Sequence, residues 1–180
     1  MDTRNVISYY KYWETEAIIA DLDTKRHNFS VLCANIQGDF NIGTVIRNAN
    51  AFLAKEVIIF GKKKFMPNGA VGTHHYTHFQ HVTESDDLSK LKTPDVYIVG
   101  VDNIDGAQAI DTIELPQDKH IIFAFGEENS GLPPEMLDMC DALVYIKQYG
   151  SVRSLNVGSA SGIIMYEYCR RLYSGEGSDQ

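Results

Sequence analysis

The residues best suited to chemistry lie between positions 145 and 162, where a hydrophobic strand end runs into a polar loop and then directly into a helix. The first turn of this helix reads Ser154-Leu155-Asn156, and Ser154 is expected to be its N-cap. Backbone N–H groups at a helix start have no partner inside the helix, so they could bind a ligand. Many proteins contain a strand, a glycine-containing loop and a helix start, so the meaning of this stretch depends on the rest of the chain.

A second candidate is Arg47, which follows Asn41 in the segment Asn41-Ile-Gly-Thr-Val-Ile-Arg47. The helix expected over residues 44–53 is otherwise apolar and is expected to face a core. A guanidinium in such surroundings needs a partner. A structural ion pair, with Glu128 as the candidate partner, and a functional role both fit, and these residues alone leave the choice open.

The elements that must position these residues alternate between strands and helices. Strands are expected at residues 29–36, 56–60, 79–82, 95–101, 120–125 and 142–146. Helices are expected at residues 44–53, within 66–75, at 85–91, near 106–110, and at 133–139 and 154–173. Continuous apolar strands that alternate with helices are typical of an α/β fold, a parallel sheet flanked by helices on both faces. The chain is expected to divide into an N-terminal helical arm (1–28), one domain (29–173) and a flexible tail (174–180).

Sheets of this kind bind ligands beyond the carboxyl ends of their strands. Four loops leave such ends with unusual composition, at residues 37–43, 100–106, 126–132 and 147–153. None of them fits the Gly-x-Gly-x-x-Gly or P-loop pattern, and the chain has no serine-centred nucleophile elbow. A plain nucleotide-binding Rossmann domain is therefore disfavoured.

The composition predicts an ordinary globular protein, with 180 residues, 44% hydrophobic and 22% charged. No apolar run approaches the ~20 residues of a membrane span, and the first residues lack a signal-peptide core, so a cytoplasmic location and no membrane partner are expected. The three cysteines are far apart and favour buried free thiols over disulfides or zinc. The net charge of −8 argues against a broad, non-specific nucleic-acid binder, but it leaves room for a local basic site.

The histidine-rich segment at residues 74–81 is a candidate metal site. On one helix, His74, His78 and His81 would share a face. However, no carboxylate or cysteine occupies an obvious ligand position, and the segment is expected to run from helix to strand. We therefore expect a partly exposed polar patch and no metal.

Three segments occur in a characteristic order: Asn41-Ile-Gly-Thr-Val-Ile-Arg47, Phe125-Gly-Glu-Glu-Asn-Ser-Gly-Leu132, and Ile146-Lys-Gln-Tyr-Gly-Ser-Val-Arg-Ser-Leu-Asn-Val157. Together they resemble the three motifs of SpoU-type (TrmH-like) RNA ribose 2′-O-methyltransferases of the SPOUT superfamily. The resemblance covers residues 29–172, and three motifs at family spacing are a specific signal. This sequence departs from the family pattern at Lys147-Gln148, which replace the usual Pro-Met. The change could loosen the cofactor loop, but it removes no side chain to which the family assigns chemistry.

The resemblance implies a C-terminal segment that threads through an earlier loop to form a deep trefoil knot, a rare topology. It also implies a homodimer with the first and last long helices at its interface, and S-adenosyl-L-methionine (AdoMet) as methyl donor. Small residues in the last helix would permit close helix approach there, although ordinary tight packing within one chain explains them as well. By position, the cofactor-binding residues would be Val101, Phe125, Gly126, Glu127, Ile146, Gly150 and Leu155.

The family assigns methyl transfer to the residues that match Arg47, Asn41, Ser154 and Asn156, and Glu128 matches a glutamate to which we give a supporting role. The acceptor is a ribose 2′-OH, a poor nucleophile that must be aligned with the methyl group and lose its proton. Arginine stays protonated in proteins, so a literal base is difficult to defend. Arg47 would act either as the family's base, assisted by an RNA phosphate, or as a clamp on that phosphate that stabilises developing negative charge.

The cations expected to contact RNA, from their charge and place in the sequence, are Lys62, Lys63, Lys64 and Arg153, although solvated surface charges are an alternative. Residues 1–28 are too short and too neutral to replace an RNA-binding domain, so tRNA is favoured over rRNA as the substrate. Three alternatives stay open: an rRNA ribose methyltransferase, an inactive RNA- or AdoMet-binding module, and a SPOUT enzyme that methylates a base. Retention of all the matching catalytic residues speaks against the inactive module, and the Asn…Arg first motif favours ribose.

Overall fold

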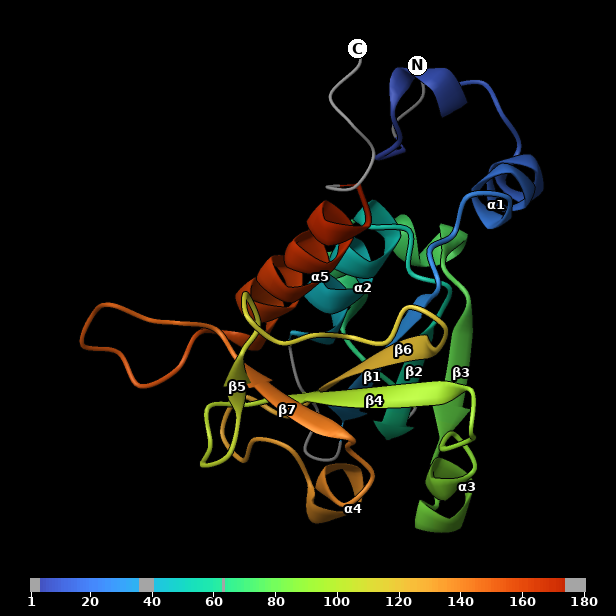
Figure 1. Cartoon of the computed structure of the whole chain (residues 1–180). Coiled ribbons are helices and arrows are strands. Elements are labelled where there is room, and N and C mark those ends of the chain that lie inside the picture. The colour runs from blue at the N-terminus through green and yellow to red at the C-terminus, as the bar shows by residue number, and fades with distance from the viewer. Residues whose placement is uncertain (1–3, 36–40, 63, 174–180) are drawn as a thin grey trace.

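The computed structural model describes residues 4–35, 41–62 and 64–173. Its centre is a seven-stranded sheet with the order β3-β2-β1-β6-β4-β7-β5, in which every pair of neighbouring strands runs parallel (Figure 1). The strands are β1 (Phe29–Asn35), β2 (Val57–Gly61), β3 (Phe79–Val82), β4 (Val96–Val101), β5 (Gln108–Ala109), β6 (His120–Phe125) and β7 (Ala142–Tyr145).

Helices cover both faces of this sheet, as the continuous apolar strands predict. The α-helices are α1 (Thr15–Asp23), α2 (Ile42–Ala51), α3 (Ser85–Ser89), α4 (Pro134–Leu137) and α5 (Val157–Tyr173). The 3₁₀-helices are η1 (Ser8–Tyr10), η2 (Pro67–Ala70) and η3 (Thr73–Tyr76). In Figure 1, α2 and α5 lie side by side on one face, and α3 and α4 lie on the other. The parallel α/β sheet with helices on both faces is thus confirmed.

Strand β1 shows why two cores form. Its residues alternate between the faces, so Phe29 and Val31 pack in the same cluster as the buried residues of α2 and α5. Leu32 lies in the second cluster, with Leu88 of α3 and Met136 of α4. A strand that is apolar at every position can therefore be buried on both sides, and all seven residues of β1 are buried.

One predicted helix is wrong. The segment near residues 106–110 forms the short edge strand β5, where Gln108 pairs with Val144 and Ala109 with Tyr145 of β7. The N–H of Ile110 also donates to the carbonyl of Tyr145 at 3.0 Å. Backbone groups that would bond within a helix are instead satisfied by a distant strand, which local sequence does not reveal.

The last helix starts three residues later than predicted, and its N-cap is Asn156, not Ser154. The N–H of Ser159 donates to Oδ1 of Asn156 at 3.2 Å, and the N–H of Ala160 donates to the Asn156 carbonyl at 2.8 Å. Asparagine is as good an N-cap as serine, so residue type did not decide between the two positions. Helix α2, in contrast, starts two residues earlier than predicted, at Ile42. The N–H of Val45 donates to the Asn41 carbonyl at 3.0 Å.

A third hydrophobic cluster packs N-terminal residues against η3 through Tyr10, Ile18, Leu22 and Tyr76. Arg26 adds backbone anchors, since its guanidinium donates to the carbonyls of Ala54 and Tyr76 at 3.0 and 3.2 Å. The proposed tail, residues 174–180, lies outside the described residues. Among the helices of the described ranges, none has both the length and the apolar character needed to cross a membrane.

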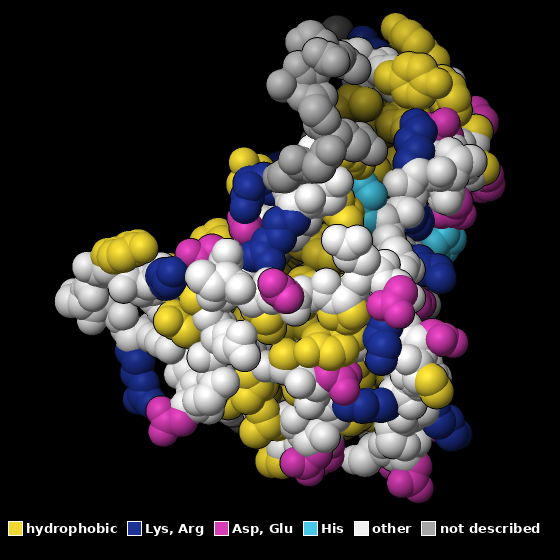
Figure 2. Space-filling view, in the orientation of Figure 1, with side chains coloured by type: hydrophobic (Ala, Val, Ile, Leu, Met, Phe, Trp, Pro, Cys, Tyr) yellow, Lys and Arg dark blue, Asp and Glu magenta, His cyan; other side chains and the backbone are white. Residues whose placement is uncertain are grey.

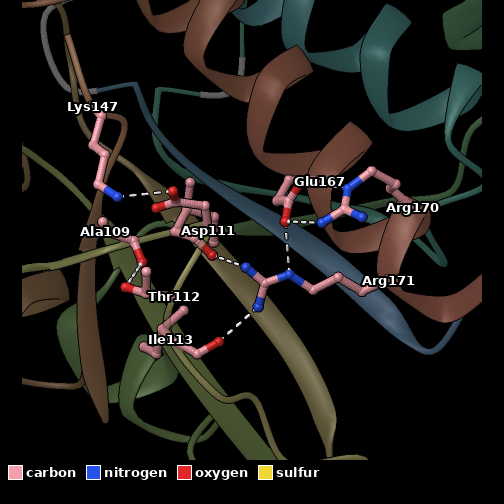
Figure 3. A network of polar contacts seen from close by, with 9 residues as sticks. Ala109, Asp111, Thr112, Ile113, Lys147, Glu167, Arg170 and Arg171 are labelled. Carbon is pink, nitrogen blue, oxygen red and sulfur yellow. Dashed lines mark hydrogen bonds and ion pairs between the residues drawn. The ribbon is translucent and has the colours of Figure 1, made fainter. Parts of the chain in front are cut away.

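A polar network fastens the C-terminal turns of α5 to the segment that follows β5 (Figure 3). Arg171 donates to the carbonyl of Ile113 at 2.6 Å and to that of Ile110. Glu167 accepts hydrogen bonds from Arg170 and Arg171 at 2.8 Å, and these two cations hold the pKa of Glu167 at about 2, below its ordinary value. This network fixes the far end of the helix whose first turn lies at the candidate site.

Candidate active site

A cavity of about 390 Å³ opens at the carboxyl ends of β4, β6 and β7. Parallel strands end at the same edge of their sheet, so the loops that follow these three strands meet there. The lining includes the predicted cofactor-binding residues Val101, Phe125, Gly126, Glu127, Ile146 and Leu155, and also Glu128, Arg153 and Ser154. Gly150 is not among the lining residues.

The loop after β6 depends on a glycine at position 126. A Cβ atom there would lie 2.0 Å from the carbonyl carbon of Gly131, so any other residue would force the backbone apart. This close approach lets Glu127 and Gly131 exchange two backbone hydrogen bonds, at 3.0 and 2.9 Å. The Glu127 side chain is buried and accepts a hydrogen bond from Ser130 Oγ at 3.2 Å. The loop is therefore held as a compact turn against the cavity.

Asp102 and Asn103 also line the cavity, and sequence reasoning did not single them out. Asp102 Oδ2 accepts the N–H of Leu132 at 3.2 Å, which joins the loop after β4 to the loop after β6. Asn103 Nδ2 donates to the carbonyl of Arg153 at 3.3 Å, which joins it to the loop before α5. The sequence feature that could have identified both residues is their position directly after an apolar strand, in one of the four loops of unusual composition.

Three side chains from the three sequence motifs meet beside the cavity. Asn41 Nδ2 donates to Glu128 Oε2 at 2.9 Å, and Asn156 Nδ2 donates to Asn41 Oδ1 at 2.7 Å. Asn156 Nδ2 also lies 3.3 Å from Glu128 Oε1. Glu128 and Asn156 are exposed, so a ligand in the cavity mouth could reach this group. We call these three residues the amide–carboxylate cluster.

Close packing of α2 against α5 brings the two asparagines of this cluster together. Asn48 of α2 donates to the carbonyl of Gly158 at 2.8 Å and to Ser161 Oγ at 2.9 Å. A Cβ atom on Gly158 would lie 2.8 Å from Thr44 Cγ2. The small residues of α5 therefore allow close approach within one chain, and they align the N-terminal ends of both helices.

Arg47 is exposed on α2, which contradicts the expectation that it faces a core. The core-facing positions are Ile42, Val45, Ile46 and Ala49. The ion pair with Glu128 is absent from the described part of the chain, because the Glu128 carboxylate accepts amide N–H groups instead. Within the same part of the chain, the Arg47 guanidinium has neither a hydrogen bond nor an ion pair, so it is available to a ligand.

The predicted RNA contacts are not gathered at one place. Arg153 lines the cavity, whereas the side chains of Lys62 and Lys64 are exposed beyond the end of β2 and do not line it. The carbonyls of these two lysines accept hydrogen bonds from Asn35 Nδ2 at 2.7 and 3.1 Å, which fixes the backbone there. Lys63 lies outside the described residues.

The histidine segment does not form the single helix on which three histidines would share a face. His78 pairs with Asp23 at 2.8 Å, and His81 Nε2 lies 2.8 Å from the Gly61 carbonyl. His74 packs against His75 in η3. In the ranges that the structure describes, no group of three His, Cys, Asp or Glu residues is arranged to hold a metal ion.

The three segments lie within the part of the chain that matches a known family. Residues 28–166 match the model of the SpoU rRNA Methylase family. The chain is 32% identical over 177 residues to a Coxiella burnetii protein named 23S rRNA (guanosine-2′-O-)-methyltransferase RlmB, an alignment that covers 95% of this chain and 65% of the relative. It is 27% identical to the Escherichia coli tRNA (guanosine(18)-2′-O)-methyltransferase, over 83% of this chain and 66% of that protein.

A solved structure has the same fold. The SpoU methyltransferase AviRb from Streptomyces viridochromogenes, in complex with the cofactor AdoMet, superposes with a TM-score of 0.72 at 26% identity. That superposition covers 86% of this chain and 65% of the AviRb chain. This chain thus spans about two thirds of the length of each of these three relatives.

Proposed function

This chain belongs to the SpoU rRNA methylase family, and from that premise we propose that it transfers a methyl group from AdoMet to a ribose 2′-OH of RNA. The observation that carries the proposal is the amide–carboxylate cluster, in which one residue from each of the three motifs meets beside a cavity. Relatives named for ribose methylation of 23S rRNA and of tRNA support the same reaction.

The cavity suits AdoMet in size and in polarity. Its volume of about 390 Å³ lies within the range of small-molecule sites. Asp102, Glu127 and Glu128 line it and complement a ligand that carries positive charge. Gln148, another lining residue, has a buried Oε1 without a hydrogen-bond partner in the described part of the chain, and an N–H donor on a ligand would satisfy it. We propose that Val101, Phe125, Gly126, Glu127, Ile146 and Leu155 hold the cofactor, with Gly150 farther out.

Bound AdoMet would supply an electrophilic methyl group on a sulfonium. The chain's own residues must then orient the ribose and stabilise charge on its 2′ oxygen. We propose that Asn41 and Asn156, aligned by Glu128, orient the ribose together with the hydroxyl of Ser154 at the cavity edge. The exposed guanidinium of Arg47 would bind an RNA phosphate and stabilise the negative charge that develops on the 2′ oxygen as its proton passes to water. The oxygen–methyl bond would form as the methyl–sulfur bond breaks, which would leave the cofactor as a neutral thioether.

We favour tRNA over rRNA as the substrate. The relatives leave both classes open, because the Coxiella protein is named for 23S rRNA and the E. coli protein for position 18 of tRNA.

The exposed cations Lys62, Lys64 and Arg153 would contact phosphate groups of the RNA. Lys63 belongs to the same proposal by its position in the sequence.

We also propose a trefoil knot and a homodimer. The knot proposal is supported by the bonds from Arg171 to the carbonyls of Ile110 and Ile113, which hold the last helix against an earlier segment (Figure 3). The dimer proposal is supported by the exposed apolar side chains Ile163, Tyr166 and Tyr173 on the outer face of α5. Light scattering of the purified protein should give twice the chain mass, and a mass of one chain would contradict the dimer.

The reaction is tested by incubating the protein with methyl-labelled AdoMet and with total tRNA or total rRNA, followed by nucleoside analysis. Label on a 2′-O-methyl nucleoside is expected, whereas label on a base, or none with any RNA, would overturn the proposal. Arg47→Ala should lower turnover about 100-fold or more, since it removes a group that stabilises charge in the transition state. Its Kd for AdoMet should stay unchanged. Lys90→Ala, an exposed lysine next to α3, is the surface control.

A further inference from the structure

The loop between β7 and α5, residues 146–156, reaches away from the body of the molecule (Figure 1). Its tip carries Tyr149, whose side chain is 94% exposed, and Val152, which is 61% exposed. In a folded protein, a large aromatic ring held almost entirely in water has no packing role. We propose that Tyr149 stacks on an unpaired base of the substrate RNA next to the cavity, an inference that rests on the proposed function.

The two ends of this loop are fixed at the cavity, so the position of its tip is tied to the site. Gln148 and Arg153 both line the cavity. Lys147 Nζ forms an ion pair with Asp111 Oδ2 at 2.9 Å, which raises the pKa of the lysine through that hydrogen bond. On the other side, Asn103 Nδ2 donates to the Arg153 carbonyl at 3.3 Å. A nucleotide that stacks on Tyr149 would therefore be held in a defined position relative to the ribose that enters the cavity.

The charge of the loop favours RNA as the occupant. Residues 146–156 contain Lys147 and Arg153 and no acidic residue, in a chain with a net charge of −8. In Figure 2, the same projection carries hydrophobic and basic side chains at its surface. Proteins recognise unpaired RNA bases by stacking them on aromatic rings while cations bind the phosphates. Lys147 is already paired with Asp111, so Arg153 is the cation of this loop that we expect to bind a phosphate. An exposed tyrosine near this arginine, in a loop anchored at a site that must accept a ribose, has the components of such a contact.

The test compares Tyr149→Ala with Tyr149→Trp and with a matched control, Tyr12→Ala. Tyr12 is 86% exposed on the N-terminal arm, so its loss removes a ring of equal size far from the cavity. Tyr149→Ala should raise the KM for RNA about tenfold, the loss expected for one stacked base. Its kcat and its Kd for AdoMet should not change. Tyr149→Trp should restore the wild-type KM, because tryptophan also stacks.

Three outcomes would overturn the inference. If the wild type methylates RNA and Tyr149→Ala has an unchanged KM, the stacking is wrong while the proposed function stands. If Tyr149→Ala changes the mass measured by light scattering, the ring belongs to an interface between two copies of this chain. If the wild type neither binds nor methylates tRNA or rRNA, the proposed function fails, and the stacking proposal fails with it.

Discussion

Replacing Asn156 separates the two roles that this residue has in the structure. Its Oδ1 accepts the N–H of Ser159 at 3.2 Å and thereby caps α5. Its Nδ2 donates to Asn41 Oδ1 at 2.7 Å and lies 3.3 Å from Glu128 Oε1. Alanine removes both functions. Aspartate keeps an oxygen for the cap but replaces the amide donor with a second carboxylate beside Glu128.

The expected effects on stability differ between the two variants. Loss of an N-cap costs about 1 kcal/mol, so Asn156→Ala should unfold about 2–4 °C below the wild type for a domain of this size. In Asn156→Asp, repulsion from the exposed Glu128 costs about 1 kcal/mol in water-like surroundings. The favourable interaction of the new charge with the helix N-terminus, about 0.3–1 kcal/mol, offsets most of it. Both variants also lose the amide donor, so Asn156→Asp, which keeps the cap oxygen, should unfold at a higher temperature than Asn156→Ala.

The expected effects on methyl transfer are alike, because both variants lose the amide donor. Hydrogen bonds to charged groups contribute about 1.5–3 kcal/mol, so turnover should fall at least about tenfold in each variant. Thermal unfolding by circular dichroism and transfer of labelled methyl groups to RNA measure the two effects separately. Asn68→Ala, an exposed asparagine in η2, is the matched control. Wild-type unfolding of Asn156→Ala would refute the cap, and wild-type turnover of Asn156→Asp would refute the role of the amide.

Three further outcomes are expected. Gly126→Ala should lose AdoMet binding and unfold at a lower temperature than the wild type, because its Cβ would lie 2.0 Å from the Gly131 backbone. The control is Gly150→Ala, which should unfold like the wild type because its Cβ would meet nothing within 4 Å. The pKa of Glu167, about 2, lies below its unfolded value of about 4.3, so its stabilisation is present above pH 5 and is lost as the pH falls toward 2. The difference between the urea midpoints of the wild type and Glu167→Gln should therefore be about half as large at pH 3 as at pH 6, and an equal difference at both pH values would contradict this. Burial raises the pKa of the Cys169 thiol to about 11, so little of the reactive thiolate is present at pH 8. A thiol reagent at pH 8 should therefore label Cys169 only after unfolding, and rapid labelling of Cys169 in the native protein would refute this.

Most of the fold could be predicted from the sequence because its strands are continuous apolar runs between polar turns. Strand β1 is buried at every position, and β6 is buried at five of its six positions, so their hydrophobic pattern is visible without tertiary information. The short strand β5 could not be predicted in this way. It has two residues, and its backbone partners in β7 lie more than 30 residues later in the chain. Such an element is defined by its partner, and no local period marks it.

The start of α5 shows a different limit. Ser154 and Asn156 are both good N-caps two residues apart, so helix propensity alone could not decide between them. A tertiary contact favours Asn156, because its Nδ2 donates to Asn41 Oδ1 at 2.7 Å while its Oδ1 accepts the N–H of Ser159 at 3.2 Å. The partner Asn41 lies 115 residues earlier in the chain, so no local propensity reveals this contact.

The geometry of the candidate site follows from the packing of α2 against α5 more than from any one motif. The motifs name Asn41 and Asn156, but they do not state that Asn156 donates to Asn41 at 2.7 Å. That distance requires the two helix starts to lie together, and Gly158 permits this because a Cβ there would lie 2.8 Å from the Thr44 side chain. A larger residue at position 158 would push the helices apart and separate the asparagines. Gly158, which has low helix propensity, thus allows the first and third motifs to come into contact.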